Sequence, residues 1–215
     1  MPKALFLSCT LKKSPEPSHT EGLMRESMGI FEQAGFETEL VRFVDHPIAF
    51  SVQADEGAGS VWGRDDAWPA IFAKVMEADA VVIGSPIWLG NPSSACIQLL
   101  ERLYAHSSET NEKDQYVFYN KVGGAVVTGN EDGGKFVSSR ILYSLQHIGF
   151  TVPPGADSYW VGEAGPGPSY MEAGRDNDFT KQTLRIMTWN LIHFARMLIE
   201  RPIPAEGNTV PSGTH

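Results

Sequence analysis

The sequence predicts one α/β domain, in which helices cover both faces of a five-stranded parallel sheet. Short apolar runs rich in β-branched residues alternate along the chain with longer stretches of helical period. One run, Val81–Gly84, is apolar up to its final glycine, which is typical of a strand buried on both faces of a parallel sheet. The length of 215 residues is sufficient for one such domain with a full core.

Composition and charge narrow the classes of function. The chain is 42% hydrophobic and has a net charge of −9 without a compensating basic patch, so we expect no nucleic-acid partner. No apolar run approaches the length that crosses a bilayer, and the stretch from Met1 to Leu5 lacks a signal-peptide pattern. Cys9 and Cys96 lack metal-ligand spacing, which favours reduced core thiols, no bound metal and a cytoplasmic location away from membranes.

The start of the chain predicts a strand, a helix and a second strand, over residues 3–9, 20–34 and 36–43. This order implies a right-handed parallel crossover. Ser18 and Glu21 have the spacing of a capping box at the start of the helix.

Residues 45–63 fit neither the helical nor the strand period, and we interpret them as an insertion that forms a lid or an oligomer contact. A helix over 65–78 and a strand over 80–84 follow. Asn91 is the expected N-cap of the next helix, over 92–104, because Pro92 suits a first helical position.

The second half of the chain predicts a strand over 121–128, a helix over 135–148, a short fifth strand over 150–152 and a last helix over 176–200. Tyr159–Val161 is a candidate for an added edge strand, and the Gly- and Pro-rich residues 162–174 predict a loop. We expect the domain to cover residues 1–201 and to end in a frayed tail over 202–215.

Three loops follow the first, third and fourth predicted strands, and their carboxyl ends should meet at the edge where open α/β sheets bind ligands. The first loop is rich in hydroxyls and ends at a helix start, which suits a phosphate, although hydroxyls are equally common as turn and cap residues. The loop after the third strand carries Trp88 and free amides, which suit a flat heterocycle. The alternative for Trp88 is a partly buried core indole.

Three other nucleotide- and phosphate-related sites are excluded by the residues present. The chain has no Gly-x-x-x-x-Gly-Lys-Ser/Thr motif, and Gly-x-Gly-x-x-Gly is absent after the first strand. A phosphorylation-receiver domain needs acidic residues where this chain has Ser8-Cys9-Thr10 and Ser85-Pro86.

Three motifs carry a resemblance to a known family. They are Ser-x-Thr with Ser-His-Thr in the first loop, Gly-Ser-Pro-Ile-Trp-Leu-Gly-Asn-Pro-Ser-Ser from Gly84, and Val-Val-Thr-Gly-Asn-Glu-Asp-Gly-Gly from Val126. Over residues 3–199 the chain resembles the flavodoxin-like superfamily and, within it, the NAD(P)H-dependent FMN reductases. The resemblance implies a three-layer sandwich with sheet order 2-1-3-4-5, FMN as cofactor and NAD(P)H as electron donor.

The resemblance also implies which residues contact FMN. The phosphate contacts would be Ser8, Thr10, Ser18, His19 and Thr20. The isoalloxazine would be lined by Pro86, Ile87, Trp88, Leu89, Gly90 and Asn91, and closed on its other edge by Thr128, Gly129, Asn130, Gly133 and Gly134. The first loop departs from the commoner Gly-Ser-x-Arg form because it has no arginine, and Lys12 and Lys13 are candidates for the missing charge.

Hydride transfer to a flavin needs stacking and orientation more than an acid–base group, so we predict no catalytic side chain. Backbone amides of the ring-lining loops would instead stabilise the reduced ring. His106, His147 and His193 are expected to have structural roles.

The first functional hypothesis is an FMN-dependent oxidoreductase that uses NAD(P)H to reduce a quinone, a free flavin or another small acceptor. Two alternatives stay open: a flavodoxin-type electron carrier without nicotinamide turnover, and a binding module without redox chemistry. Tyr159, Trp160 and residues 162–174 either contribute to a substrate opening or form an exposed loop. Related reductases also imply a homo-oligomer, a dimer or a tetramer.

Overall fold

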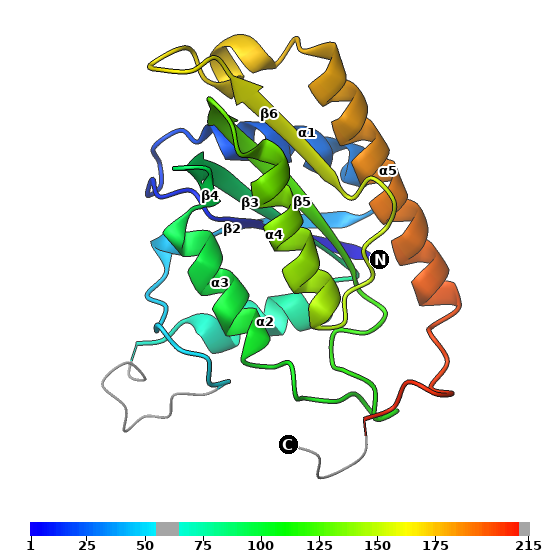
Figure 1. Ribbon diagram of the computed structural model, residues 1–215. Coiled ribbons are helices and arrows are strands. Elements are labelled where there is room, and N and C mark those ends of the chain that lie inside the picture. Colours follow the sequence, from blue (N-terminus) through cyan, green and yellow to red (C-terminus); the bar gives the residue numbers. More distant parts are fainter. Residues whose placement is uncertain (55–64, 211–215) are drawn as a thin grey trace.

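The computed structural model describes residues 1–54 and 65–210 and shows a three-layer arrangement (Figure 1). The five parallel strands lie in the order β2-β1-β3-β5-β6, and a two-residue strand, β4, pairs antiparallel with the end of β3. Their bounds are β1 Lys3–Ser8, β2 Glu37–Arg42, β3 Ala80–Trp88, β4 Asn91–Pro92, β5 Val122–Asn130 and β6 Asp157–Gly162. Without β4 the order is 2-1-3-4-5, the flavodoxin-like order that was predicted.

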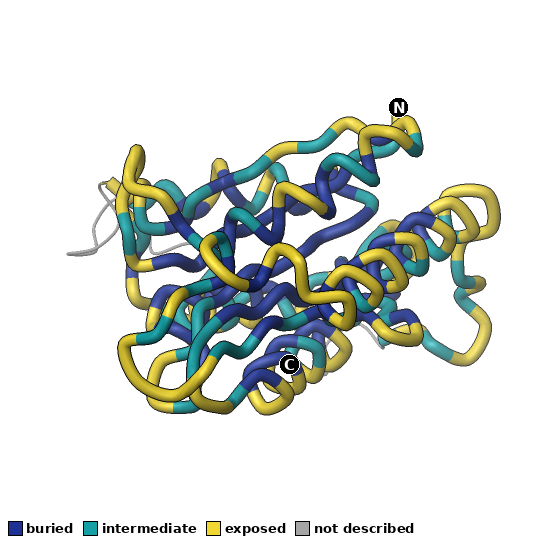
Figure 2. Tube along the Cα trace, turned by 90° about the horizontal axis from the view of Figure 1, so that it is seen from above, coloured by how far each residue is buried: buried dark blue, intermediate teal, exposed yellow. Residues whose placement is uncertain are grey.

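The helices divide between the two faces of the sheet. One face is covered by α1 (His19–Gln33) and α5 (Asp178–Glu200), and the other by α2 (Trp68–Glu77), α3 (Ser94–Tyr104) and α4 (Gly134–His147). Alternate side chains of β1 enter the two cores: Leu5 and Leu7 pack with α2 and α3, whereas Phe6 packs with α1 and α5. Figure 2 shows the buried trace along the sheet between helices whose outer turns are exposed.

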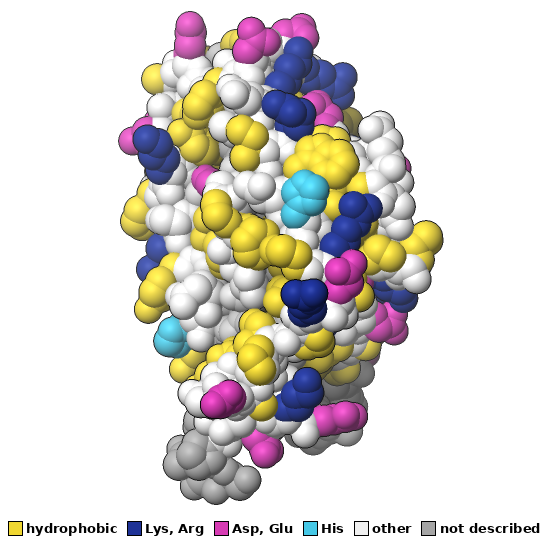
Figure 3. Space-filling view, turned by 90° about the vertical axis from the view of Figure 1, so that its right-hand side faces the viewer, with side chains coloured by type: hydrophobic (Ala, Val, Ile, Leu, Met, Phe, Trp, Pro, Cys, Tyr) yellow, Lys and Arg dark blue, Asp and Glu magenta, His cyan; other side chains and the backbone are white. Residues whose placement is uncertain are grey.

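The outer side of α5 is exposed and mixed in character. Figure 3 shows hydrophobic side chains among scattered basic and acidic ones on this side of the molecule. The large exposed hydrophobic residues of α5 are Phe179, Ile186, Trp189, Met197 and Ile199. Among residues 1–54 and 65–210, none of the helices combines the length and the apolar character that a membrane crossing requires.

The start of α1 confirms half of the predicted capping box. The Ser18 hydroxyl accepts a hydrogen bond from the Glu21 amide at 3.3 Å, as an N-cap does. The Glu21 carboxylate does not return to the backbone of Ser18, so the other half of the prediction is wrong. It binds the guanidinium of Arg42 instead, because a charged bidentate partner is stronger than a single amide.

The predicted start of α3 was wrong by two residues. Asn91 and Pro92 fold back against Ile87 and Trp88 as β4, and Ser93 is the N-cap, with its hydroxyl accepting from the Cys96 amide at 3.2 Å. The same hydroxyl donates to the carbonyl of Cys9 at 2.6 Å. This contact with the first loop selects Ser93 over Asn91.

The fifth strand also differs from its predicted place. Residues 150–152 provide only a single bridge, from Thr151 to Val122, whereas the edge strand is β6. Two prolines and Gly155 end the first segment, and the following residues alternate between half-buried and buried. The candidate edge strand Tyr159–Val161 is thus the centre of the real fifth strand.

The described part of the C-terminal segment is packed rather than frayed. The buried side-chain amide of Gln115 donates to the carbonyls of Ile203 and Pro204 and to the side chain of Asn208, at 3.0 to 3.3 Å. The amide of Val210 donates to the carbonyl of Asp114 at 2.8 Å.

The predicted insertion over residues 45–63 lies partly outside the described residues, which exclude 55–64. Its described part is tied to the body of the protein: the buried side chain of Arg102 donates to the carbonyl of Gln53 at 3.0 Å and to Asp66 at 2.9 Å. Whether the insertion is a lid or an oligomer contact stays a prediction.

Candidate active site

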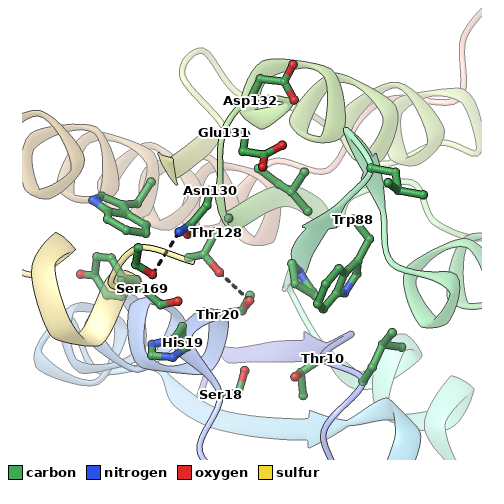
Figure 4. Close-up of a pocket in the computed structure, with 18 of the residues that line it drawn as sticks. Thr10, Ser18, His19, Thr20, Trp88, Thr128, Asn130, Glu131, Asp132 and Ser169 are labelled. Atoms are coloured by element: carbon green, nitrogen blue, oxygen red, sulfur yellow. Dashed lines mark hydrogen bonds between the residues drawn. The ribbon is translucent and has the colours of Figure 1, made fainter. Parts of the chain in front are cut away.

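A cavity of about 850 Å³ opens at the carboxyl edge of the sheet, a volume within the usual range for small-molecule and cofactor sites. Figure 4 shows side chains from α1 and the first loop on one side, and from the ends of β3 and β5 and the residues that follow β5 on the others. The lining residues are Thr10, Leu11, Lys12, Ser18, His19, Thr20, Pro86–Gly90, Thr128–Asp132, Trp160, Gly165–Gly167, Ser169 and Tyr170.

Most of the predicted cofactor contacts line this cavity, and four do not: Ser8, Asn91, Gly133 and Gly134. Ser8 ends β1 and is fully buried, and in the described part of the chain its hydroxyl has no hydrogen-bond partner. Gly133 lies behind the lining, where a Cβ would come within 2.9 Å of the Gly90 Cα. The Asn91 side chain donates to the Leu89 carbonyl at 2.9 Å and so supports the turn.

One end of the cavity, formed by the first loop and the start of α1, is suited to an anion. The first amides of a helix have no partner within the helix, and the amides of His19 and Thr20 make no hydrogen bond to the rest of the described chain. The hydroxyls of Thr20 and Thr128 are 2.7 Å apart and join the start of α1 to the end of β5. Lys12, held across the loop by the Pro17 carbonyl at 3.2 Å, is the only lysine or arginine among the cavity-lining residues described.

His19 has a defined protonation state at this end. Its Nδ1 accepts the Met171 amide at 3.2 Å, and partial burial lowers the pKa of the ring below its usual value. The ring is therefore neutral at pH 7 and carries its proton on Nε2. His19 thus offers a hydrogen-bond donor and also holds residues 170–174, which form a short π-helix, η2, against α1.

The other end is built from exposed and conformationally unusual residues. The Trp88 side chain is 57% exposed, so the alternative of a core indole was wrong. Leu89, which is 99% exposed, has a φ of 51° and is followed by Gly90 at 73°, and Glu131 on the facing loop has a φ of 74°. Non-glycine residues with a positive φ cost free energy and cluster at functional sites.

A fourth wall, from β6 and residues 165–170, was not among the predicted contacts. Trp160 and Tyr170 are nearly fully buried there, and the Asn130 side chain donates to the Gly167 carbonyl at 3.3 Å. The Tyr170 hydroxyl donates to Glu26 at 2.9 Å, and burial, followed by this carboxylate, raises the pKa of the phenol. The Gly- and Pro-rich composition of residues 162–174 was the signal for this wall, and it supports the substrate-opening hypothesis over a free surface loop.

The comparison with known families decides the class of protein. Residues 2–164 match the family described as NADPH-dependent FMN reductase. The chain belongs to this family. Its members are flavin-dependent oxidoreductases, and the flavodoxin-like fold and the position of the cavity agree with that membership.

Two curated relatives and one solved structure are similar over nearly the whole chain. The 8-demethyl-8-aminoriboflavin-5′-phosphate synthase of Streptomyces davaonensis is 41% identical, covering 93% of this chain and 79% of that protein. The crystal structure of RosB with its bound intermediate 8-demethyl-8-formylriboflavin-5′-phosphate has a TM-score of 0.86 at 38% identity, covering 94% and 82% of the two chains. A divalent metal cation transporter, MntH, of Mycobacterium bovis is 46% identical over 99% of this chain, which spans only 33% of that protein's length.

The cavity of this FMN reductase family member fits FMN by its own chemistry. A phosphate needs free amides, hydroxyls and a cation, which the start of α1, Ser18 and Lys12 provide. A flat ring needs an apolar face and backbone that approaches closely, which Trp88 and Gly90 provide.

Proposed function

We propose that this protein binds FMN in the cavity and uses NAD(P)H to reduce a small acceptor such as a quinone or a free flavin. The observation that carries the proposal is one cavity with two different ends: free amides, hydroxyls and Lys12 at one, and a half-exposed indole with glycine-containing turns at the other. Family membership and the flavin phosphate bound to RosB support it.

The residues at the two ends would have distinct tasks. The α1 amides, Ser18 and Lys12 would hold the phosphate dianion. Trp88 would cover an apolar face of the ring, and the amide of Gly90 would donate to its polar edge. FMN would supply the redox chemistry, taking a hydride from NAD(P)H and passing two electrons to the acceptor.

The wall formed by Trp160 and Tyr170 would bound the space for the second molecule. Both side chains are nearly fully buried and line the cavity, so they exclude water from one side of it. A planar aromatic acceptor would match such a wall better than a charged aliphatic one.

The test starts from purified protein saturated with FMN and filtered to remove free flavin. We expect the retained protein to show a flavin spectrum and to oxidise NADH or NADPH when a quinone is added without oxygen. Trp88→Ala keeps the anion end intact and is expected to lower the rate more than it lowers FMN retention. FMN found wholly in the filtrate would overturn the proposal, and FMN retention without nicotinamide oxidation would favour an electron carrier.

A second candidate function is favoured by the similarity to the Streptomyces davaonensis enzyme over 93% of this chain. In this candidate the flavin phosphate is the substrate and is changed at position 8. Mass spectrometry of flavin recovered after incubation with riboflavin 5′-phosphate, oxygen and amine donors tests it. An unchanged flavin mass in every incubation would leave the reductase as the better account.

A further inference from the structure

The guanidinium of Arg42, the last residue of β2, is fully engaged behind the first loop. Its Nε and Nη2 donate to the two carboxylate oxygens of Glu21 at 2.6 and 2.7 Å. Its Nη1 donates to the carbonyls of Lys12 at 3.2 Å and Glu16 at 2.9 Å. The side chains of Arg42 and Glu21 are only 9% and 5% exposed, so this is a built contact rather than a surface ion pair.

These bonds hold the first loop at Lys12, which lines the anion end, and at Glu16, between Lys12 and the cavity-lining Ser18. Lys12 lines the cavity, and its carbonyl and that of Glu16 are both bound to Arg42. A carbonyl oxygen that faced a phosphate would repel it. By occupying two of these oxygens, Arg42 removes acceptors from the loop and fixes its path.

The same arginine neutralises Glu21, a buried carboxylate beside the anion end. It is the third residue of α1, directly after the cavity-lining His19 and Thr20, and its side chain is buried. An uncompensated carboxylate there would cancel the positive end of the helix and repel a dianion. The bidentate ion pair with Arg42 neutralises it.

We propose that Arg42 is a positioning residue for the flavin 5′-phosphate: it neutralises Glu21 and holds the Lys12–Glu16 stretch, so that a loop without an arginine of its own accepts a dianion. This inference rests on the proposed function. It predicts that Arg42 governs the preference for FMN over riboflavin, which has the same ring without the phosphate.

The test measures the dissociation constants of FMN and riboflavin for the wild type and for Arg42→Met by quenching of flavin fluorescence. We expect the preference for FMN to fall about tenfold, within the effect of one charge at a helix N-terminus, while riboflavin affinity changes much less. Arg196→Met is the matched control, because Arg196 donates to the carbonyl of Ala34 at the opposite end of α1. Its preference is expected to equal that of the wild type.

Two further variants separate the neutralisation of Glu21 from the hydrogen-bond geometry of Arg42. Glu21→Gln in the Arg42→Met background removes the uncompensated charge and is expected to recover part of the FMN preference. Should Arg42→Met not fold, Arg42→Lys keeps the charge without the fork geometry and is expected to give an intermediate preference.

The outcomes distinguish this inference from the proposed function. Equal losses of FMN and riboflavin affinity in Arg42→Met, or an unchanged preference, would overturn the role of Arg42. A double variant that recovers nothing would overturn the neutralisation of Glu21. Wild-type protein that binds neither flavin would overturn the proposed function itself.

Discussion

The two ends of the cavity are held in different ways. The anion end is fixed from behind: Arg42 binds Glu21 and two loop carbonyls, and Asp45 accepts from the amide and hydroxyl of Ser14 at 2.9 and 2.5 Å. The ring end has few such bonds, and Trp88 and Leu89 are exposed there. A phosphate is the same in every flavin nucleotide, whereas acceptors differ, so we expect affinity to reside at the first end and selectivity at the second.

The largest expected effect comes from breaking the anion end. Arg42→Met leaves a buried carboxylate without its partner and is expected to lower the free energy of unfolding by about 3 kcal/mol. Urea denaturation measures it. The double variant Arg42→Met/Glu21→Met is expected to lose less, because an apolar pair replaces the ion pair. Equal losses in the two variants would show that the ion pair is not the cause.

The next test adds a side-chain atom to the turn behind the ring end. Gly133 has a φ of 89°, and a Cβ there would come within 2.9 to 3.0 Å of the Gly90 backbone. Gly133→Ala is expected to lower the free energy of unfolding by about 2 kcal/mol, because backbone strain and overpacking act together. Thermal denaturation measures the loss.

Gly35→Ala is the matched control for Gly133→Ala. Gly35 has a φ of 83°, but a Cβ there would meet no atom within 4 Å. It is expected to cost about 1 kcal/mol from strain alone and to leave flavin binding unchanged. Equal losses at the two positions would contradict the close approach of the two loops.

A pH test sharpens the comparison at His19, which joins the anion end to the fourth wall. Because burial lowers the pKa of His19 in the folded protein, the unfolded chain binds the proton more readily. This contribution to stability is complete above the unfolded value near 6.5 and is lost as the pH falls through the lowered folded value. His19→Gln is expected to reduce the loss of stability on acidification. The midpoint of urea unfolding, measured at a series of pH values, checks this. An unchanged pH dependence would rule out this role.

The smallest expected effect concerns the fourth wall alone. Tyr170→Phe removes the hydrogen bond to Glu26, an exposed carboxylate that water can satisfy, and is expected to cost about 0.5 kcal/mol. Tyr143→Phe, at a residue that is 66% exposed, is the control and should cost less. If Tyr170→Phe lowered the free energy of unfolding as much as Arg42→Met, the anion end would not be the more strongly held part of the cavity.

The layers and three of the four cavity walls were predictable because they follow from local patterns. Apolar runs gave β1, β3 and β5, and the loops that follow them line the cavity. The start of α3 was not predictable, because Asn91 and Ser93 are both good caps and only the contact of Ser93 with Cys9 decides between them. β6 was predicted only as the candidate edge strand Tyr159–Val161, because the segment Phe-Thr-Val at 150–152 gave a stronger local signal for the fifth strand than the alternation at 157–162.

The contacts that shape the site join residues far apart in the chain. Arg42 meets Glu21, and His19 meets the Met171 amide. No local period predicts such pairs, since each partner alone has the pattern of an ordinary surface or cap residue. This is why the sequence indicated a missing charge in the first loop but not the strand that compensates for it.

The packing of residues 202–210 determines where the protein tolerates cutting or fusion. A version shortened to end at Arg201 would remove three acceptors from the buried Gln115 amide, together with the Val210 amide that binds the Asp114 carbonyl. Reporter domains and affinity handles are therefore better joined beyond Val210 than in place of this segment.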